Sequence, residues 1–354
     1  MAYTNIDDPS AHFQTLLWTG NDVDGRALTN DGNSDLQPDL VWLKNRNAGY
    51  PHFLQDSSRG TSVYLSSSTT TGDTTWTNLV ESFDTNGFTV GDDGSQVPNH
   101  IGNTFVGWQW KANGGTTSSN TAGGTTTTVQ ANQDAGFSIV TWTGNGTTTT
   151  LGHGLGVRPD VIIQKARGTT SNWNVYHKNA TNGQQPYNVI TNLNLNDATG
   201  IASNTWGTVD TDITSSVFYL KYWINYNTTN LAYCFAEKQG YSKFGSYVGN
   251  GSADGTFVYT GFKPAWVMTK EIAAAGAWVM YDNKRSTTAN PQDKYFSANT
   301  SDAEATFTQY DFVSNGFKFR NADTFWNASG STYIFMAFAE SPFTTSTGVP
   351  ITAR

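Results

Sequence analysis

One proline-led phrase occurs three times in the chain, and this repetition constrains the fold more strongly than any other sequence feature. The copies read QPDLVWLKNR, RPDVIIQKAR and KPAWVMTKE, and their prolines are Pro38, Pro159 and Pro264. Each copy follows a segment that contains Gly-Asn, and each unit closes with an alternating segment, NTFVGWQWKA, TNLAYCFAEK or STYIFMAFAES. Matched elements in a fixed order indicate one structural unit repeated three times.

The spacing of the copies predicts the domain boundaries. Gly144 and Gly249 stand 105 positions apart, whereas Gly20 and Gly144 stand 124 apart. The excess is a stretch rich in Gly, Thr, Ser and Asn, a composition typical of flexible linkers. We therefore expect repeats at 1–112, 137–240 and 241–343, a linker at 113–136 and a tail at 344–354. Only a short segment joins the second and third repeats, so these two should form a rigid pair while the first can swing.

Composition and patterning predict an all-β fold. The 35 glycines, the many threonines and the 14% aromatic residues suit turns and pleated strands, and no long segment has an apolar period of 3.6. Repeats of roughly 100 residues with several short strands are the size of a β-sandwich. We expect three tandem β-sandwich domains of jelly-roll or lectin-like type. Their closing strands should point inward with Val106, Trp108 and Trp110; Leu231, Tyr233 and Phe235; and Ile334, Met336 and Phe338.

Charge and hydropathy argue against several partner classes. The net charge is −8, and no Lys/Arg cluster is present to displace counterions from nucleic acid. An acidic surface also disfavours anionic membranes. The first residues resemble no signal peptide, and no apolar run is long enough to span a bilayer. We expect folding in a reducing cytosol, with the single cysteine, Cys234, as a small buried hydrophobe.

No constellation of catalytic or metal-binding residues stands out. Glycosidases need two carboxylates across a cleft, but Glu237 and Glu340, which match between the second and third repeats, are expected at solvated strand ends. We therefore predict no enzymatic activity and no cofactor. The loop at 21–35 holds Asp22, Asp24 and Asp31, as calcium loops do, yet lacks a glutamate at position twelve. A polar loop is the favoured interpretation, with calcium as the alternative.

Three tryptophans are candidates for ligand contact. Trp76, Trp206 and Trp326 lie in the polar stretches GDTTWTN, SNTWGTV and DTFWNAS, one in each repeat. If exposed, they could stack on sugar rings or anchor a partner protein. The other interpretation is that each closes the edge of its sandwich.

Several longer segments point to a family. GHGLGVRPDVII, AYCFAE, GYSKFGSYVGNGSADGTFVYTGFKPAWVM and FMAFAESPF resemble the repeated lectin-like (concanavalin-like) domain proteins of tailed bacteriophages of marine bacteria, of the tail-fibre or virion structural type. The first repeat departs most, because it has Gln37 and Pro38 where the second has Gly-His-Gly-Leu-Gly, and it lacks the final Ala-Glu. The resemblance supplies no catalytic residues.

The resemblance implies a non-enzymatic virion protein that assembles in the host cytoplasm and is exposed on the particle. Two placements are open: a tail-fibre, receptor-binding role that holds host surface glycans, or decoration of the capsid or tail. Its partners would be other virion proteins, with no nucleic acid and no membrane. A homotrimer and a monomer whose three repeats fill three similar environments are both open. The alternative function is a carbohydrate-active depolymerase or lectin on the same fold.

Overall fold

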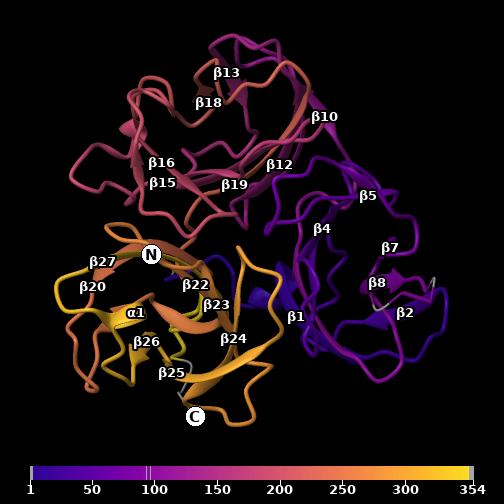
Figure 1. The fold of residues 1–354 in the computed structure, drawn as a ribbon, viewed down its shortest axis with the longest axis vertical. Coiled ribbons are helices and arrows are strands. Elements are labelled where there is room, and N and C mark those ends of the chain that lie inside the picture. Colours follow the sequence, from indigo (N-terminus) through magenta and orange to yellow (C-terminus); the bar gives the residue numbers. More distant parts are fainter. Residues whose placement is uncertain (1–2, 93, 96, 351–354) are drawn as a thin grey trace.

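The computed structural model describes residues 3–92, 94–95 and 97–350. Strands are the main regular secondary structure of the described residues, which confirms the all-β prediction. The helical segments of the described residues are short: η1 (Pro9–Ala11), η2 (Pro186–Asn188) and α1 (Thr324–Asn327). Figure 1 shows three lobes that meet at a common centre. We call them the first unit (3–112), the second unit (113–240) and the third unit (241–343).

Each unit contains the same antiparallel arrangement of four strands. In the first unit the order is β1 (Phe13–Thr19), β9 (Thr104–Trp110), β3 (Leu40–Asn45) and β4 (Phe53–Asp56). The matching strands of the second unit are β12 (Phe137–Thr143), β19 (Thr229–Phe235), β14 (Val161–Ala166) and β15 (Asn174–His177). Those of the third unit are β20 (Ser242–Val248), β27 (Thr332–Pro342), β22 (Phe262–Glu271) and β23 (Val279–Asp282). The repeat inferred from the sequence is therefore a repeat of structure.

The remaining strands extend or cover these four. The first unit adds a sheet of β2 (Arg26–Thr29), β8 (Gly87–Val90) and β7 (Val80–Asp84), and the pair β5 (Val63–Tyr64) and β6 (Thr74–Thr75). The second unit adds β10 (Ser118–Asn120), β11 (Thr127–Asn132), β16 (Val189–Asn192) and β17 (Gly200–Ile201) at the sheet edges, and the pair β13 (Thr149–Gly152) and β18 (Val217–Leu220). The third adds β24 (Gln292–Ser297), β25 (Ala305–Val313), β26 (Gly316–Phe319) and β21 (Phe257–Tyr259).

The prediction of a linker at 113–136 is wrong for much of that segment. Strand β11 lies within it and pairs with β12, with Val129 opposite Val140. Val129 is buried in the core of the second unit, and Gln130 is fully buried against Ser57 of the first. The alternation of small apolar and polar residues lets this Thr-rich stretch add to a sheet edge, although its composition resembles a linker. Of the expected tail, residues 351–354 lie outside the described part of the chain.

One hydrophobic core is shared by all three units. The side chains predicted to point inward on the closing strands β9, β19 and β27 are all buried, and all of them belong to this one core. They meet at the centre: Phe338 stacks on Phe13 of the first unit, with ring centroids 5.3 Å apart, and lies 5.9 Å from Phe235 of the second. Trp110 and Trp266 meet edge to face at 5.8 Å. The centre of the molecule is therefore a joint core.

Each unit also has a private core on the other face of its four strands. These cores are built around Trp18 and Phe88, Trp142 and Phe218, and Tyr247 and Phe317. Because both faces of each closing strand are covered, the three units are lobes of one body. The expectation of a freely swinging first unit is wrong, since its Trp42, Trp108 and Trp110 lie in the joint core.

Candidate functional site: the seams between the units

The repeated polar residues of the sequence lie mostly at the seams where two units meet. We call the contact of the first and second units the first seam, that of the second and third units the second seam, and that of the third and first units the third seam. Equivalent side chains repeat their contacts from seam to seam, some toward the next unit and some toward the preceding one. The three units therefore have an approximate threefold arrangement (Figure 1).

The first set of these contacts involves the last residues of β4, β15 and β23, which are Asp56, His177 and Asp282. Asp56 accepts a hydrogen bond from the Tyr233 hydroxyl at 2.8 Å across the first seam, and Asp282 accepts one from Trp108 Nε1 at 2.9 Å across the third. At the second seam the closing strand has Met336 at this position, which has no polar hydrogen to donate. There the aspartate is replaced by His177, whose Nε2 lies 3.1 Å from the Phe335 carbonyl oxygen.

Two buried arginines hold these aspartates. Arg59 Nε lies 2.6 Å from the Asp56 carboxylate, and Arg285 Nε lies 2.5 Å from that of Asp282, with all four side chains fully buried. Burial of an ion pair is expensive unless its hydrogen bonds are satisfied, and the tyrosine and tryptophan donors across the seams help to satisfy them. These buried ion pairs are therefore stable only when the units are docked correctly.

A second ring of contacts runs the other way around the centre. His52, Trp173 and Trp278 occupy matching positions four residues before Asp56, His177 and Asp282. Trp173 Nε1 donates to the Ser66 carbonyl at 2.7 Å and Trp278 Nε1 to the Asn192 carbonyl at 2.9 Å, each in the preceding unit. His52 Nε2 lies 3.1 Å from the Ser297 carbonyl of the third unit, so this ring also closes.

The matched lysines of the proline phrase complete the seams. Lys44 and Lys165 are fully buried and donate to the carbonyls of Ser301 at 3.1 Å and Thr70 at 2.8 Å, each in the preceding unit. Lys270 donates to the Glu271 carbonyl, and Asp197 of the second unit adds an opposite charge. Loss of hydration lowers the pKa of all three ammonium groups to about 8.

The Gly-Asn motifs fasten the outer end of each unit. A Cβ on Gly20, Gly144 or Gly249 would lie 2.0–2.2 Å from a backbone oxygen, so the close approach requires glycine at all three places. The asparagine that follows each glycine accepts a hydrogen bond from a second buried asparagine. The three pairs are Asn21 with Asn99, Asn145 with Asn225, and Asn250 with Asn327. These motifs are structural.

The three tryptophans proposed to stack on sugar rings are buried or half-buried. Trp206 is fully buried in the second unit's private core, and Trp326 is 7% exposed in that of the third. Trp76 is half-buried and packs edge to face on Phe53 and Tyr64. Each ring therefore packs on the private core of its own unit, which agrees with the alternative interpretation.

The acidic residues singled out in the sequence are engaged separately. Asp22 accepts from the Ile101 amide at 2.6 Å, Asp24 accepts from the Asp92 amide at 2.8 Å, and Asp31 pairs with Lys284 at 3.0 Å. Glu237 pairs with Lys178 and Lys243, and Glu340 pairs with Lys263, all at strand ends. Within the described residues, no group of three or more His, Cys, Asp or Glu side chains could hold a metal ion.

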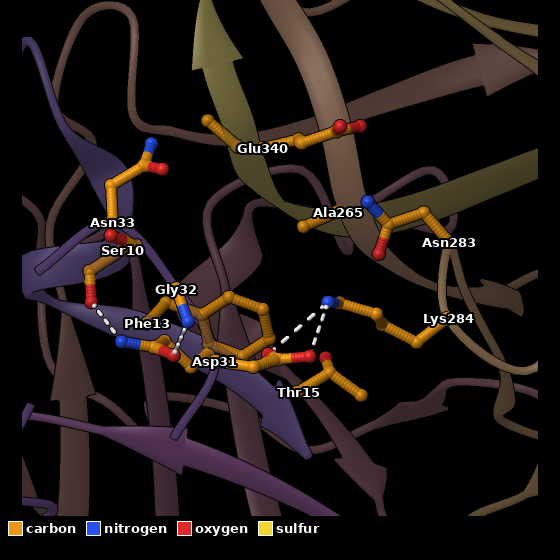
Figure 2. A pocket seen from close by; sticks show the side chains of 12 residues that line it. Ser10, Phe13, Thr15, Asp31, Gly32, Asn33, Ala265, Asn283, Lys284 and Glu340 are labelled. Carbon is orange, nitrogen blue, oxygen red and sulfur yellow. Dashed lines mark hydrogen bonds and ion pairs between the residues drawn. The ribbon is translucent and has the colours of Figure 1, made fainter. Parts of the chain in front are cut away.

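The third seam contains a hollow of about 210 Å³ that sequence reasoning missed. Figure 2 shows the first unit on one side, with Phe13, Thr15 and Asn33, and the third unit on the other, with Asn283 and Glu340. Gln14 holds the first-unit wall, because its amide donates to the carbonyls of Ser10 at 2.9 Å and Ser34 at 2.8 Å and accepts from the Gly32 amide at 2.9 Å. The Asp31–Lys284 ion pair crosses the seam.

The hollow has a mixed lining. Its floor is apolar, with Phe13, Ala265 and Ala339 buried. The amides of Asn33 and Asn283 form no side-chain hydrogen bond to any residue in the described ranges. An apolar floor with a few unpaired polar groups can hold a small polar molecule. The only signal in the sequence is that the third proline phrase reads Pro-Ala where the others read Pro-Asp.

A comparison with protein families places the chain. A family model described as a domain of unknown function, DUF7483, matches residues 8–342. The chain belongs to this family. The match spans all three units together, which agrees with their shared core. No curated protein and no solved structure matches the chain. The described residues form no helix long and apolar enough to cross a membrane.

Proposed function

We propose that this DUF7483 chain is a non-enzymatic structural protein exposed on the surface of a bacteriophage particle, where it decorates the capsid or tail. We also propose that the three units of this all-β fold are three fused lectin-like β-sandwiches. The virion would be its location and other virion proteins its partners.

The observation that carries the proposal is the cyclic closure of three equivalent units on one core. A symmetric shell repeats one surface patch around each of its rotation axes. A body with three similar lobes can contact three such patches at once, and weak contacts made by one rigid body reinforce one another through effective concentration. The single chain thus supplies three similar contact surfaces, as a homotrimer would, which favours the monomer among the two oligomeric states left open by the sequence.

Decoration is favoured over a tail-fibre role by the shape and the buried tryptophans. Shafts of long fibres carry sustained heptads or other long repeats. The described chain instead forms a body of three lobes around one core (Figure 1). The glycan contact first assigned to Trp76, Trp206 and Trp326 also loses its basis, because two are buried and the third packs on aromatic neighbours.

Mass spectrometry and electron cryomicroscopy of purified particles from the cells that encode the chain test the proposal. We expect the protein in stoichiometric amount and a three-lobed density on a threefold or quasi-threefold position. Absence of the protein from purified particles would refute the virion assignment, and density at a fibre tip would replace decoration with receptor binding. Release of reducing sugar from capsular polysaccharide by the purified chain would instead support a depolymerase.

A further inference from the structure

We propose that Asn182 is a site of self-modification, at which the side-chain amide is slowly converted to the carboxylate of aspartate or isoaspartate. An asparagine that precedes glycine is prone to this reaction, because glycine lets the attacking backbone nitrogen approach closely. The chain contains six such pairs, which begin at Asn86, Asn113, Asn145, Asn182, Asn250 and Asn315. The inference goes beyond the proposed function and does not depend on it, because the reaction needs only the folded chain and water.

The reaction uses atoms of the chain and of water. The backbone nitrogen of Gly183 loses its proton to hydroxide and attacks Cγ of Asn182, so a C–N bond forms and the Cγ–Nδ2 bond breaks. The Nδ2 group takes a proton from water and leaves as ammonia. Water then adds to either carbonyl of the resulting succinimide ring and opens it to aspartate or isoaspartate. The sum is one water consumed and one ammonia released, and the attack requires a glycine N–H that no acceptor holds.

Two of the six pairs belong to the Gly-Asn motifs at the outer ends of the second and third units, where the attacking nitrogen is held. The Gly146 N–H donates to the Asn225 carbonyl at 3.1 Å. The Gly251 N–H donates to the Asn327 carbonyl at 2.8 Å. Each motif must therefore open before its glycine nitrogen can attack, which slows the reaction.

Three more pairs are protected by other contacts. The Gly87 N–H donates to the Leu36 carbonyl at 2.9 Å. The Gly114 N–H donates to the Asp39 carboxylate at 2.9 Å. Gly316 is the first residue of β26 and lies between β25 and β21 in the sheet of the third unit. The backbone around these glycines is therefore fixed by the fold.

The sixth pair, Asn182 and Gly183, has no such protection. The two residues form the centre of a turn that the Gln184 amide closes by donating to the Thr181 carbonyl at 2.6 Å. Gly183 is exposed, and its N–H donates to no acceptor in the described ranges of the chain. A Cβ on Gly183 would meet no atom within 4 Å, so the surroundings are open. Asn182 has φ +38°, a strained conformation for a residue with a side chain.

The modification would weaken a contact at the second seam. Asn182 Nδ2 donates to the Thr199 carbonyl at 3.0 Å, and the Thr199 amide donates to the Ile272 carbonyl of the third unit at 2.9 Å. A carboxylate at position 182 only accepts hydrogen bonds, so it cannot bond to the Thr199 carbonyl. Isoaspartate also adds a carbon to the backbone of the turn. The segment at Thr199 should therefore loosen where the second unit meets the third.

Ageing of the purified full-length chain at mildly alkaline pH tests the site. Peptide mapping by mass spectrometry follows the amide-to-acid change at all six asparagines, and the other five pairs serve as internal controls. We expect Asn182 to convert about tenfold faster than any of these five, the factor for one hydrogen bond that need not be broken. The rate at Asn182 should rise with hydroxide concentration. In urea the protection is lost, so the six rates should become similar.

A variant and hydrogen exchange test the effect on the seam. The aged parent chain should exchange the Thr199 amide about tenfold faster than the fresh chain. Asn182→Gln has a longer side chain that does not close the five-membered ring, so ageing should leave its Thr199 exchange unchanged. The matched control is Asn204→Gln, at an exposed asparagine with φ +55° that no glycine follows, and it should age as the parent does. The rates in the parent chain keep the test decisive if Asn182→Gln fails to fold.

Three results would overturn the inference. The first is conversion of another of the six asparagines in the folded chain at a rate equal to that of Asn182, which would show that the glycine hydrogen bonds do not protect. The second is an unmodified Asn182 in the folded chain under conditions that convert the unfolded chain. The third is unchanged exchange of the Thr199 amide in a sample in which Asn182 is fully converted, which would remove the effect on the second seam.

Discussion

Replacement of Phe338 by alanine should destabilise all three units together. The Phe338 ring lies in the joint core at 5.3 Å from Phe13, 5.9 Å from Phe235 and 5.8 Å from Trp266, measured between ring centroids. It is 1% exposed, so its removal leaves a cavity bordered by every unit. A buried Phe→Ala substitution costs about 3–5 kcal/mol of unfolding free energy, from lost transfer energy and the cavity together.

The expected shift in melting temperature follows from the length of the chain. At about 2.1 cal/mol/K per residue, the unfolding entropy of 354 residues is about 0.7 kcal/mol/K. A loss of 3–5 kcal/mol then lowers the melting temperature by about 4–7 °C if the whole chain unfolds as one unit. Differential scanning calorimetry measures both the shift and the number of transitions.

The number of unfolding transitions shows whether the three units are coupled. We expect a single transition for the parent chain and for Phe338→Ala. Phe88→Ala, in the private core of the first unit, is the matched control for size and burial, and it should also shift the whole transition. Two resolved transitions, of which Phe338→Ala moves only the one assigned to the third unit, would refute a joint core that couples the units.

Three further predictions concern the seams and the outer motifs. The pKa of buried Lys44, Lys165 and Lys270 is lowered to about 8, so the unfolded chain binds more protons than the folded one between about pH 8 and 10. The urea midpoint should therefore rise with pH in that window. A midpoint that does not change with pH would contradict this. Asp282→Asn should cost about 3–5 kcal/mol of unfolding free energy in urea titrations by leaving the Arg285 charge buried, and a cost near zero would deny that the pair acts as a unit. Gly144→Ala should lower the melting temperature because its Cβ would meet a backbone oxygen at 2.1 Å, whereas Gly49→Ala, with its nearest atom at 3.5 Å, should not.

Some features of the protein follow from the sequence alone, because they depend on local pattern. Recurrent glycines, asparagines and prolines at fixed spacing mark turns and strand starts, so the threefold repeat and the all-β class could be predicted. The alternation in β9, β19 and β27 also gives the correct faces, with Trp108, Tyr233 and Met336 turned the same way. A period of two fixes which side chains share a face, whatever that face meets.

What each face meets was decided by the tertiary structure. Both faces of the closing strands are largely apolar, so the pattern could not distinguish a private core from one shared by three units. Segment 113–136 has the composition of a linker, but part of it became a strand because β12 left an edge to pair with. The hollow at the third seam is lined by both Thr15 and Ala265, which stand 250 positions apart and come together only when the ring of units closes.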